Sequence, residues 1–155
     1  MKKASKVIQN KPRSKWADDA YFLIGKTQFF SGDYFSSIET FQFVNTSYTD
    51  EYIKALSQLW LMKSYIQQGK YDDAEAIYSV LKDNTSSNKD FKTNLYLSAG
   101  DLFVKQNKKS EAINLLNAGL ARLKNKTLIY RTNFVLGQLY LENKMPHTNM
   151  YFKLI

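Results

Sequence analysis

Residues 16–44 read WADDAYFLIGKTQFFSGDYFSSIETFQFV and predict two helices joined by a tight turn. Residues that recur every three or four positions mark the buried face of each helix. These residues are Trp16, Ala20, Ile24 and Thr27 in the first helix and Ser37, Ile38, Phe41 and Val44 in the second. Gly32 can take the left-handed backbone conformation that closes a helix, and Asp33 can cap the helix that follows. The stretch is therefore predicted to be a helical hairpin.

The same pattern recurs along the chain at a nearly constant interval. Gly69 follows Gly32 by 37 residues and begins GKYDDAEAIYSVL, and Asn107 follows Gly69 by 38 residues and begins NKKSEAINLL. Asparagine tolerates a positive φ better than most residues, so Asn107 can replace glycine in the turn. The leading helices keep the same step at Gly25, Met62, Gly100 and Gly137. A fixed period of 37 or 38 residues predicts a helical repeat array.

These residues resemble the motif of the tetratricopeptide repeat. That motif has a small residue in its first helix and an aromatic residue three positions later, here Tyr65, Phe103 and Tyr140. Its second helix pairs a small residue with a large one, as in Ser37 with Phe41, Ala74 with Tyr78, and Ala112 with Leu116. Met62 at the small position and Gln28 at the aromatic position depart from the motif. The resemblance implies an all-α fold, a right-handed superhelix of antiparallel helix pairs with about 3.5 to 4 repeats.

The repeat pattern divides the chain into a basic leader, residues 1–15, and a solenoid, residues 16–155. The predicted repeats are 16–49, 50–87, 88–126 and 127–155. The predicted helix pairs are 15–30 with 33–46, 50–68 with 71–83, 88–106 with 109–124, and 127–143 with 146–154. The aromatic residues on the core stripes are expected to be buried: Trp16, Tyr21, Phe41, Tyr65, Tyr78 and Tyr140.

Both ends of the sequence are typical of a segment from a longer array. If Pro12 closes a repeat, residues 4–8 would be the end of a preceding second helix. At the other end, apolar residues crowd positions 150–155, where a solenoid usually has a polar capping helix. We therefore expect the leader to be the end of a preceding repeat.

The net charge of +8 is concentrated at the start of the chain. Six basic residues precede the first acidic one, Asp18, and without them the balance falls to +2. The leader could contact phosphates or anionic lipid, but a solvated chain end is the favoured interpretation, so nucleic acid is not the expected partner. No apolar run is as long as a membrane span, and the absence of cysteine excludes disulfides and thiolate chemistry.

The sequence offers no set of residues that would make an enzyme. His147 is the only histidine, which excludes His clusters and leaves a single candidate for a Ser/His/Asp triad. Two pairs of adjacent carboxylates, Asp18 with Asp19 and Asp72 with Asp73, lie in predicted first turns, where negative charge favours the helix dipole. No phosphate-binding glycine loop is present. We predict no catalytic residues, no metal site, no cofactor and no small-molecule substrate.

The family resemblance implies a concave groove, lined by the first helix of each repeat, that binds a partner helix or an extended apolar peptide. Carried over position by position, the groove residues are Phe22, Lys26, Phe29, Phe30, Leu59, Lys63, Ile66, Gln67, Asp101, Val104, Lys105, Arg131, Phe134, Gln138 and Leu141. Packing against neighbouring repeats is an equally good explanation for Phe29 and Phe30. The Lys and Asn pair of chaperone-binding relatives is absent, because Phe22 and Lys26 occupy those places.

A narrower resemblance concerns residues 12–20, PRSKWADDA, together with the turn at Gly32. These motifs are similar to the repeat domains of bacterial envelope lipoproteins, above all those of the Bacteroidetes gliding-motility and type IX secretion system. Outer-membrane-assembly lipoproteins are more distant relatives. The resemblance implies a scaffold in the periplasm or at the outer membrane. The alternative is a soluble cytoplasmic adaptor or regulator, which could associate with RNA through its basic leader.

Overall fold

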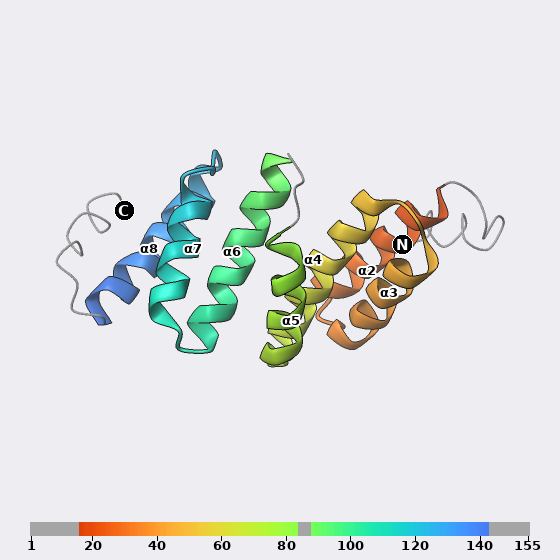
Figure 1. Cartoon of the computed structure of the whole chain (residues 1–155), viewed down its shortest axis with the longest axis horizontal. Coiled ribbons are helices and arrows are strands. Elements are labelled where there is room, and N and C mark those ends of the chain that lie inside the picture. The colour runs from red at the N-terminus through yellow and green to blue at the C-terminus, as the bar shows by residue number, and fades with distance from the viewer. Residues whose placement is uncertain (1–15, 84–87, 143–155) are drawn as a thin grey trace. The chain divides into compact units, whose positions relative to one another are not determined.

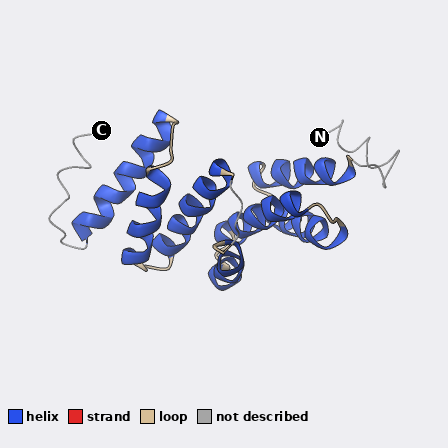
Figure 2. Ribbon diagram, turned by 45° about the horizontal axis from the view of Figure 1, so that its top comes forward, coloured by secondary structure: helices blue, strands red, loops and turns tan. Residues whose placement is uncertain are grey.

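The computed structural model describes residues 16–83 and 88–142, and every regular element in these two ranges is an α-helix. Figure 1 labels the helices, and Figure 2 colours the described residues by secondary structure, with helices in blue and loops and turns in tan. Their bounds are α2 Ala17–Phe30, α3 Tyr34–Ser47, α4 Glu51–Gln67, α5 Tyr71–Leu81, α6 Lys89–Lys105, α7 Lys109–Leu120 and α8 Lys126–Glu142. The prediction of an all-α helical repeat fold is confirmed.

The chain forms two compact units, residues 1–83 and 84–155. In the first unit α3 packs between α2 and α4, and α4 also packs against α2 and α5. In the second unit α7 packs against both α6 and α8. The predicted helix 146–154 and the predicted helix end at residues 4–8 lie outside the described residues.

The predicted helix 109–124 is too long, since α7 ends at Leu120. The backbone turns there, and the amide N–H groups of Arg122 and Leu123 bond to carbonyl oxygens only three residues back, at Gly119 and Leu120. The remaining residues up to Asn125 connect α7 to α8, where the Asn125 side chain accepts a hydrogen bond from the backbone N–H of Leu128.

The three turn residues take the left-handed backbone conformation that the repeat pattern predicted. Gly32, Gly69 and Asn107 have φ values of 83°, 73° and 59°. The residue after each turn donates its N–H to a carbonyl in the last turn of the preceding helix, as Asp33 does to Gln28 over 3.0 Å. This closure satisfies carbonyl groups that the helix itself leaves without partners. The turns therefore repeat in conformation and in hydrogen bonding.

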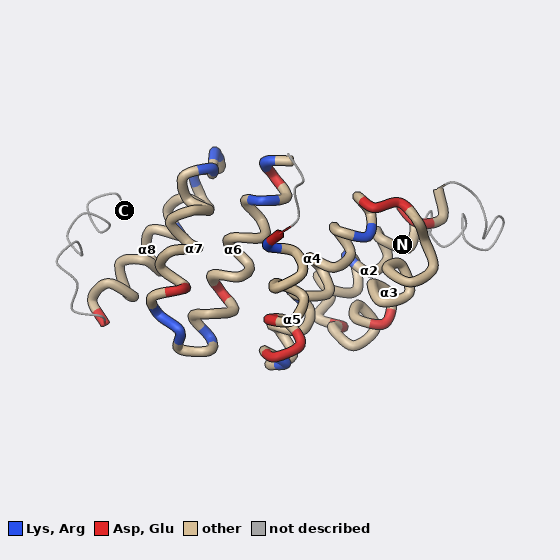
Figure 3. Tube along the Cα trace, viewed as in Figure 1, with Lys and Arg blue, Asp and Glu red and all other residues tan. Residues whose placement is uncertain are grey.

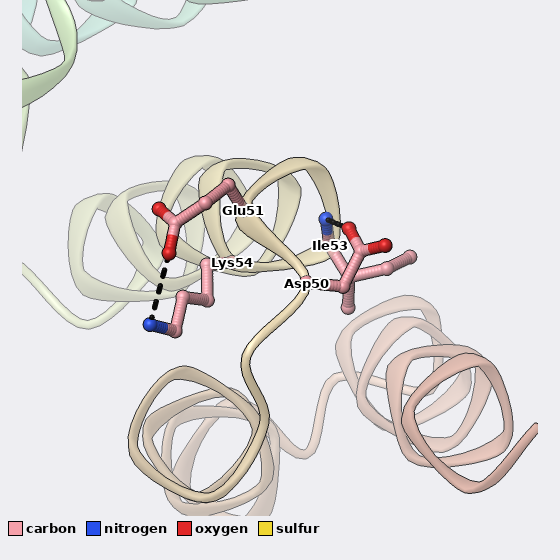
Figure 4. Close-up of polar contacts among 4 residues, drawn as sticks. All are labelled: Asp50, Glu51, Ile53 and Lys54. Atoms are coloured by element: carbon pink, nitrogen blue, oxygen red, sulfur yellow. Dashed lines mark hydrogen bonds and ion pairs between the residues drawn. The ribbon is translucent and has the colours of Figure 1, made fainter. Parts of the chain in front are cut away.

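Acidic and amide side chains start the helices, as predicted for Asp33. The Asp33 carboxylate accepts from the backbone N–H of Ser36 over 3.1 Å. Figure 4 shows the same arrangement at α4, where Asp50 accepts from Ile53 over 2.9 Å. Beside it, Lys54 forms an ion pair with Glu51 over 3.3 Å. Side-chain caps thus fix where α3 and α4 begin, whereas α2, α5 and α7 begin without one.

Small residues let the paired helices approach closely, and the same pairing occurs in both units. A Cβ atom added to Gly25 in α2 would lie 2.8 Å from two ring atoms of Phe41 in α3. A Cβ atom added to Gly100 in α6 would lie 2.6 Å from Leu116 in α7. In each pair the two residues are 16 positions apart. Gly25 and Gly100 are therefore packing residues.

Polar bonds accompany this packing. In the first unit the Ser37 hydroxyl donates to the Gly25 carbonyl over 3.0 Å and lies 3.1 Å from the Ser64 hydroxyl. A second bond links successive repeats, since the Gln42 amide donates to the Tyr65 hydroxyl over 2.9 Å. In the second unit an Asn117 amide donates to the Tyr140 hydroxyl over 3.0 Å at the same sequence separation, 23 residues. The aromatic position of the motif therefore has a polar partner as well as a packing role.

The prediction that Trp16 belongs to the core is wrong, because 59% of its surface is exposed. Trp16 precedes the first residue of α2 and does not have helical backbone angles, so it does not share the stripe that the helix buries. That stripe contains Ala17, Ala20 and Gly25, and Thr27 is exposed as well. The predicted stripe of α3 is confirmed, since all four of its residues are buried.

The other core aromatics divide into two groups. Phe41 and Tyr140 are buried, as predicted. Tyr21, Tyr65 and Tyr78 are only partly buried. For Tyr65 the reason is visible, because its hydroxyl reaches the exposed Gln42 side chain.

We predict that Gly25→Ala lowers the free energy of unfolding by about 1–2 kcal/mol. Overpacking costs about 1–3 kcal/mol, and the 2.8 Å approach to the Phe41 ring places this substitution in the upper half of that range, while the better helix propensity of alanine returns about 1 kcal/mol. Urea unfolding followed by circular dichroism measures the change. Phe41→Leu, which provides space at the contact, should cost less in the Gly25→Ala background than in the native chain. A Gly25→Ala variant as stable as the native protein would contradict the close approach.

Candidate functional site

Side chains from α2 and α4 share one surface of the first unit. These are the first helices of successive repeats, and they pack directly on each other. We call this surface the α2/α4 face and define it by Phe22, Lys26, Phe29 and Phe30 of α2 and Trp60 and Lys63 of α4. Five of these six residues were predicted from the sequence to line a groove. The structure brings those five together around the sixth, Trp60.

The Trp60 ring is the centre of the α2/α4 face. Phe29 and Phe30 meet it edge-on, with ring centroids 5.2 and 5.4 Å away. Phe41 of the core lies on the inner side, 6.4 Å from Trp60 and nearly parallel to it, and Phe22 in turn meets Phe41 edge-on. Edge-on and offset ring pairs are favourable arrangements for aromatic side chains. The face is therefore a surface extension of the hydrophobic core and is held in place by it.

Two lysines lie over these rings. The Lys63 Nζ atom is 4.4 Å from the Trp60 ring centroid, and the Lys26 Nζ atom is 5.2 Å from it. Lys26 is also 5.7 Å from the Phe22 ring centroid. Ammonium groups at such distances are attracted to the negative face of an aromatic ring. The aromatic surface thus holds two positive charges close to each other.

Burial and, to a smaller extent, the positive charge of Lys26 together lower the pKa of Lys63 to about 8. Both causes disfavour the charged form of the side chain. A lysine with a lowered pKa changes its charge near physiological pH, unlike an ordinary lysine. The α2/α4 face therefore carries a charge that depends on pH.

Three further groove residues were predicted on α4, and the structure separates them. Leu59 and Ile66 are each only 2% exposed, so their predicted contact with a partner is wrong. They align at helical spacing with Ala55 and Met62 on the buried stripe of α4, and they belong to the core. Gln67 is exposed at the end of the helix.

The remaining predicted groove residues lie in the second unit. Val104 is partly buried. The others are exposed, namely Asp101, Lys105, Arg131, Phe134, Gln138 and Leu141. Desolvation raises the pKa of Asp101, while the charges of Lys105 in α6 and Arg131 in α8 oppose the rise. Side chains of α6 and α8 therefore act on each other within this unit.

Trp60 is the site residue that the sequence analysis missed. The family positions that line a groove fall on Leu59 and Lys63 in α4, and Trp60 follows directly after the first of them. One signal could have identified it. Trp60 precedes Lys63 by three positions, which places the two side chains on the same side of a helix.

The described parts of the two units carry opposite net charges. Residues 16–83 contain 5 basic and 10 acidic side chains, a net charge of −5. Residues 88–142 contain 9 basic and 4 acidic side chains, a net charge of +5. Figure 3 marks the positions of the basic and acidic residues along the backbone of each unit. The near-neutral balance of the repeats in the sequence is the sum of two opposite contributions, and the two lysines of the α2/α4 face lie in the acidic unit.

Residues 16–83 and 88–142 contain neither a metal-binding cluster nor a membrane-spanning helix. No group of three or more His, Cys, Asp or Glu side chains in these ranges could hold a metal ion. None of the helices described there is long and apolar enough to cross a membrane.

Comparison with known families explains this architecture. Residues 1–140 match the family model described as a tetratricopeptide repeat-like domain. The chain belongs to this family. A comparison with curated proteins gave no match. Tetratricopeptide repeat-like domains are generally non-catalytic scaffolds for protein–protein interaction, and in this chain the first helices of two successive repeats form the α2/α4 face.

We predict that Lys26→Met raises the pKa of Lys63 above 8 but leaves it below 10.5, because burial, the larger cause, remains. The pKa can be measured by NMR from the lysine side-chain carbon shifts as a function of pH. Lys54→Met is the matched control. Lys54 lies on α4 together with Lys63, and its replacement should leave the Lys63 pKa unchanged. An unchanged pKa in the Lys26→Met variant would show that the two charges do not interact.

The lowered pKa also sets the sign of a stability change. Between about pH 8 and 10.5 the unfolded chain holds more protons on Lys63 than the folded chain does. The contribution of Lys63 to stability therefore rises with pH through this window. Urea unfolding of the native chain and of Lys63→Met at both ends of the window measures it. The advantage of the methionine variant should shrink as the pH rises.

Proposed function

We propose that this chain is a protein–protein interaction scaffold that holds a partner helix or extended peptide on the α2/α4 face. The observation that supports the proposal most directly is the exposed Phe30, with 72% of its surface accessible beside Trp60 and the two lysines. Exposed aromatic residues next to charges are typical of the centres of protein interfaces. The family resemblance points to the same helices, since first helices line the groove of tetratricopeptide repeats.

The packing of the face supports a binding role. Its rings are supported from below by Phe41, which is fully buried, and by the other core residues of α3 and α4. A rigid surface loses little conformational entropy when a partner docks. No catalytic chemistry is proposed, because the described residues of the face are apolar or cationic and include no acid–base pair.

The proposal predicts that a photo-crosslinking amino acid at Phe30 captures a discrete partner in cells that express the protein. The same amino acid at Phe35 on α3, which is 64% exposed but lies outside the face, is the matched control and should capture none. Mass spectrometry of the adduct identifies the partner. Equal capture from both positions would contradict the assignment of the face.

Charge reversal provides a second test of the same face. Lys26→Glu with Lys63→Glu should weaken capture at Phe30 about tenfold or more, since interface charges that are paired with a partner cost this much to lose. Helicity measured by circular dichroism should not change. The control is Lys70→Glu with Lys82→Glu, which changes two exposed lysines of the same unit. It gives the protein the same net charge as the test variant. Unchanged capture in the first variant would remove the lysines from the site.

We further propose a bacterial envelope setting, in a gliding-motility or type IX secretion assembly. Its support is the sequence similarity of residues 12–20 and of the turn at Gly32 to repeat lipoproteins of that system. An immunoblot of fractionated native cells measures both size and compartment. A larger polypeptide that requires detergent for extraction is expected, and a soluble band at 18.0 kDa would leave the cytoplasmic adaptor as the better explanation.

A further inference from the structure

Two ammonium groups converge on one ring in the α2/α4 face. Lys26 comes from α2 and Lys63 from α4, yet both Nζ atoms lie within about 5 Å of the Trp60 ring centroid, at 5.2 and 4.4 Å. The two charges repel each other, and this repulsion contributes to the lowered pKa of Lys63. An anionic group placed between them would replace the repulsion with charge-assisted hydrogen bonds. The neighbouring rings exclude water and strengthen such an interaction.

An exposed aromatic surface borders these two charges. The Phe30 ring stands edge-on to Phe29 and Trp60, with centroids 5.5 and 5.4 Å away, while 72% of the residue remains exposed. A ring held by two neighbours offers rigid apolar area, so little rotamer freedom is lost when a partner covers it. The arrangement suits a large apolar side chain that lies close to an acidic one.

The surrounding charge decides between a small anionic group and a polyanion. The described residues of the first unit carry a net charge of −5. A nucleic acid would meet this negative field over most of its length, because its binding depends on many phosphate contacts. A single carboxylate needs only the two ammonium groups. The charge distribution therefore favours an acidic side chain within a protein.

We infer that the α2/α4 face recognises an acidic residue next to a large apolar residue in a partner protein. The side-chain carboxylate binds between Lys26 and Lys63, and the apolar side chain packs on Phe30 beside Trp60. The inference rests on the proposed function and adds the chemistry of the partner to it. The recognised carboxylate belongs to the side chain of an acidic residue within the partner's sequence, so a free C-terminus on the partner is not required.

The test is an NMR titration of the full chain with short peptides whose two termini are blocked. The first peptide contains Glu-Phe within a Gly-Ser sequence, and the matched controls replace Glu with Gln or Phe with Ala. The Glu-Phe peptide should shift the indole N–H signal of Trp60 and leave that of Trp16 in place. Each control peptide should bind about tenfold more weakly or worse, as expected for the loss of a hydrogen bond to a charged group or of a buried ring.

The Lys63 pKa gives a readout that simple apolar binding would not produce. Lys26 from α2 is the charged group that acts on Lys63. If a carboxylate holds Lys63 in its charged form, the affinity for the Glu-Phe peptide should fall about tenfold between pH 7 and pH 9. The reason is that Lys63 loses its proton over this range in the protein without peptide. Lys63→Arg should still bind the peptide but should lose this pH dependence, because arginine stays charged.

The outcomes separate this inference from the proposed function. Equal affinities for the Glu-Phe and Gln-Phe peptides would overturn the inference, as would tighter binding of an oligothymidylate at Trp60. If Phe30 captures a partner in cells but the Gln-Phe peptide binds as well as the Glu-Phe peptide, the scaffold function stands and the acidic chemistry is wrong. If the Glu-Phe peptide binds as expected but Phe30 captures no partner, the chemistry stands and the proposed function fails.

Discussion

The close approach of paired helices at glycine is the constraint on which the rest of the structure depends. At Gly25 there is no room for a Cβ atom, because two atoms of the Phe41 ring would lie 2.8 Å from it. The neighbouring Ser37 hydroxyl bonds to the carbonyl of the same glycine, so the contact is fixed by packing and by a polar bond together. Gly100 and Leu116 repeat the packing in the second unit. The α2/α3 and α6/α7 hairpins are therefore each positioned by a residue that has no side chain beyond hydrogen.

This constraint also builds the α2/α4 face. Phe41, pressed against Gly25, lies nearly parallel to Trp60, and Trp60 in turn orders the rings of α2 on the surface. The surface aromatic cluster is thus supported by a closely packed part of the core. Lys26 and Lys63 lie over rings whose positions are already fixed. The binding surface follows from the way the hairpin packs, and no loop is required to form it.

The sequence predicted the repeat, its turns and most of the face. The 37- and 38-residue steps located every described helix, and the left-handed turns occur where glycine and asparagine were expected. The predictions failed where the register of a single side chain mattered. Trp16 lies just before its helix and stays exposed, and Leu59 turns into the core while its neighbour Trp60 reaches the surface. A period identifies the side of a helix, but a difference of one residue rotates the side chain by about 100°.

The amino-acid sequence by itself determined the helical hairpins, the positions of their turns and the family, because these depend on local conformational preferences and on a repeating pattern of small and large residues. Only the tertiary structure decided that Lys26 and Lys63 share one ring and that burial, together with the charge of Lys26, lowers the pKa of Lys63 to about 8. The two lysines are 37 residues apart in sequence. Their interaction exists because two helices pack side by side, and desolvation depends on what surrounds a group in space, which a local pattern does not contain.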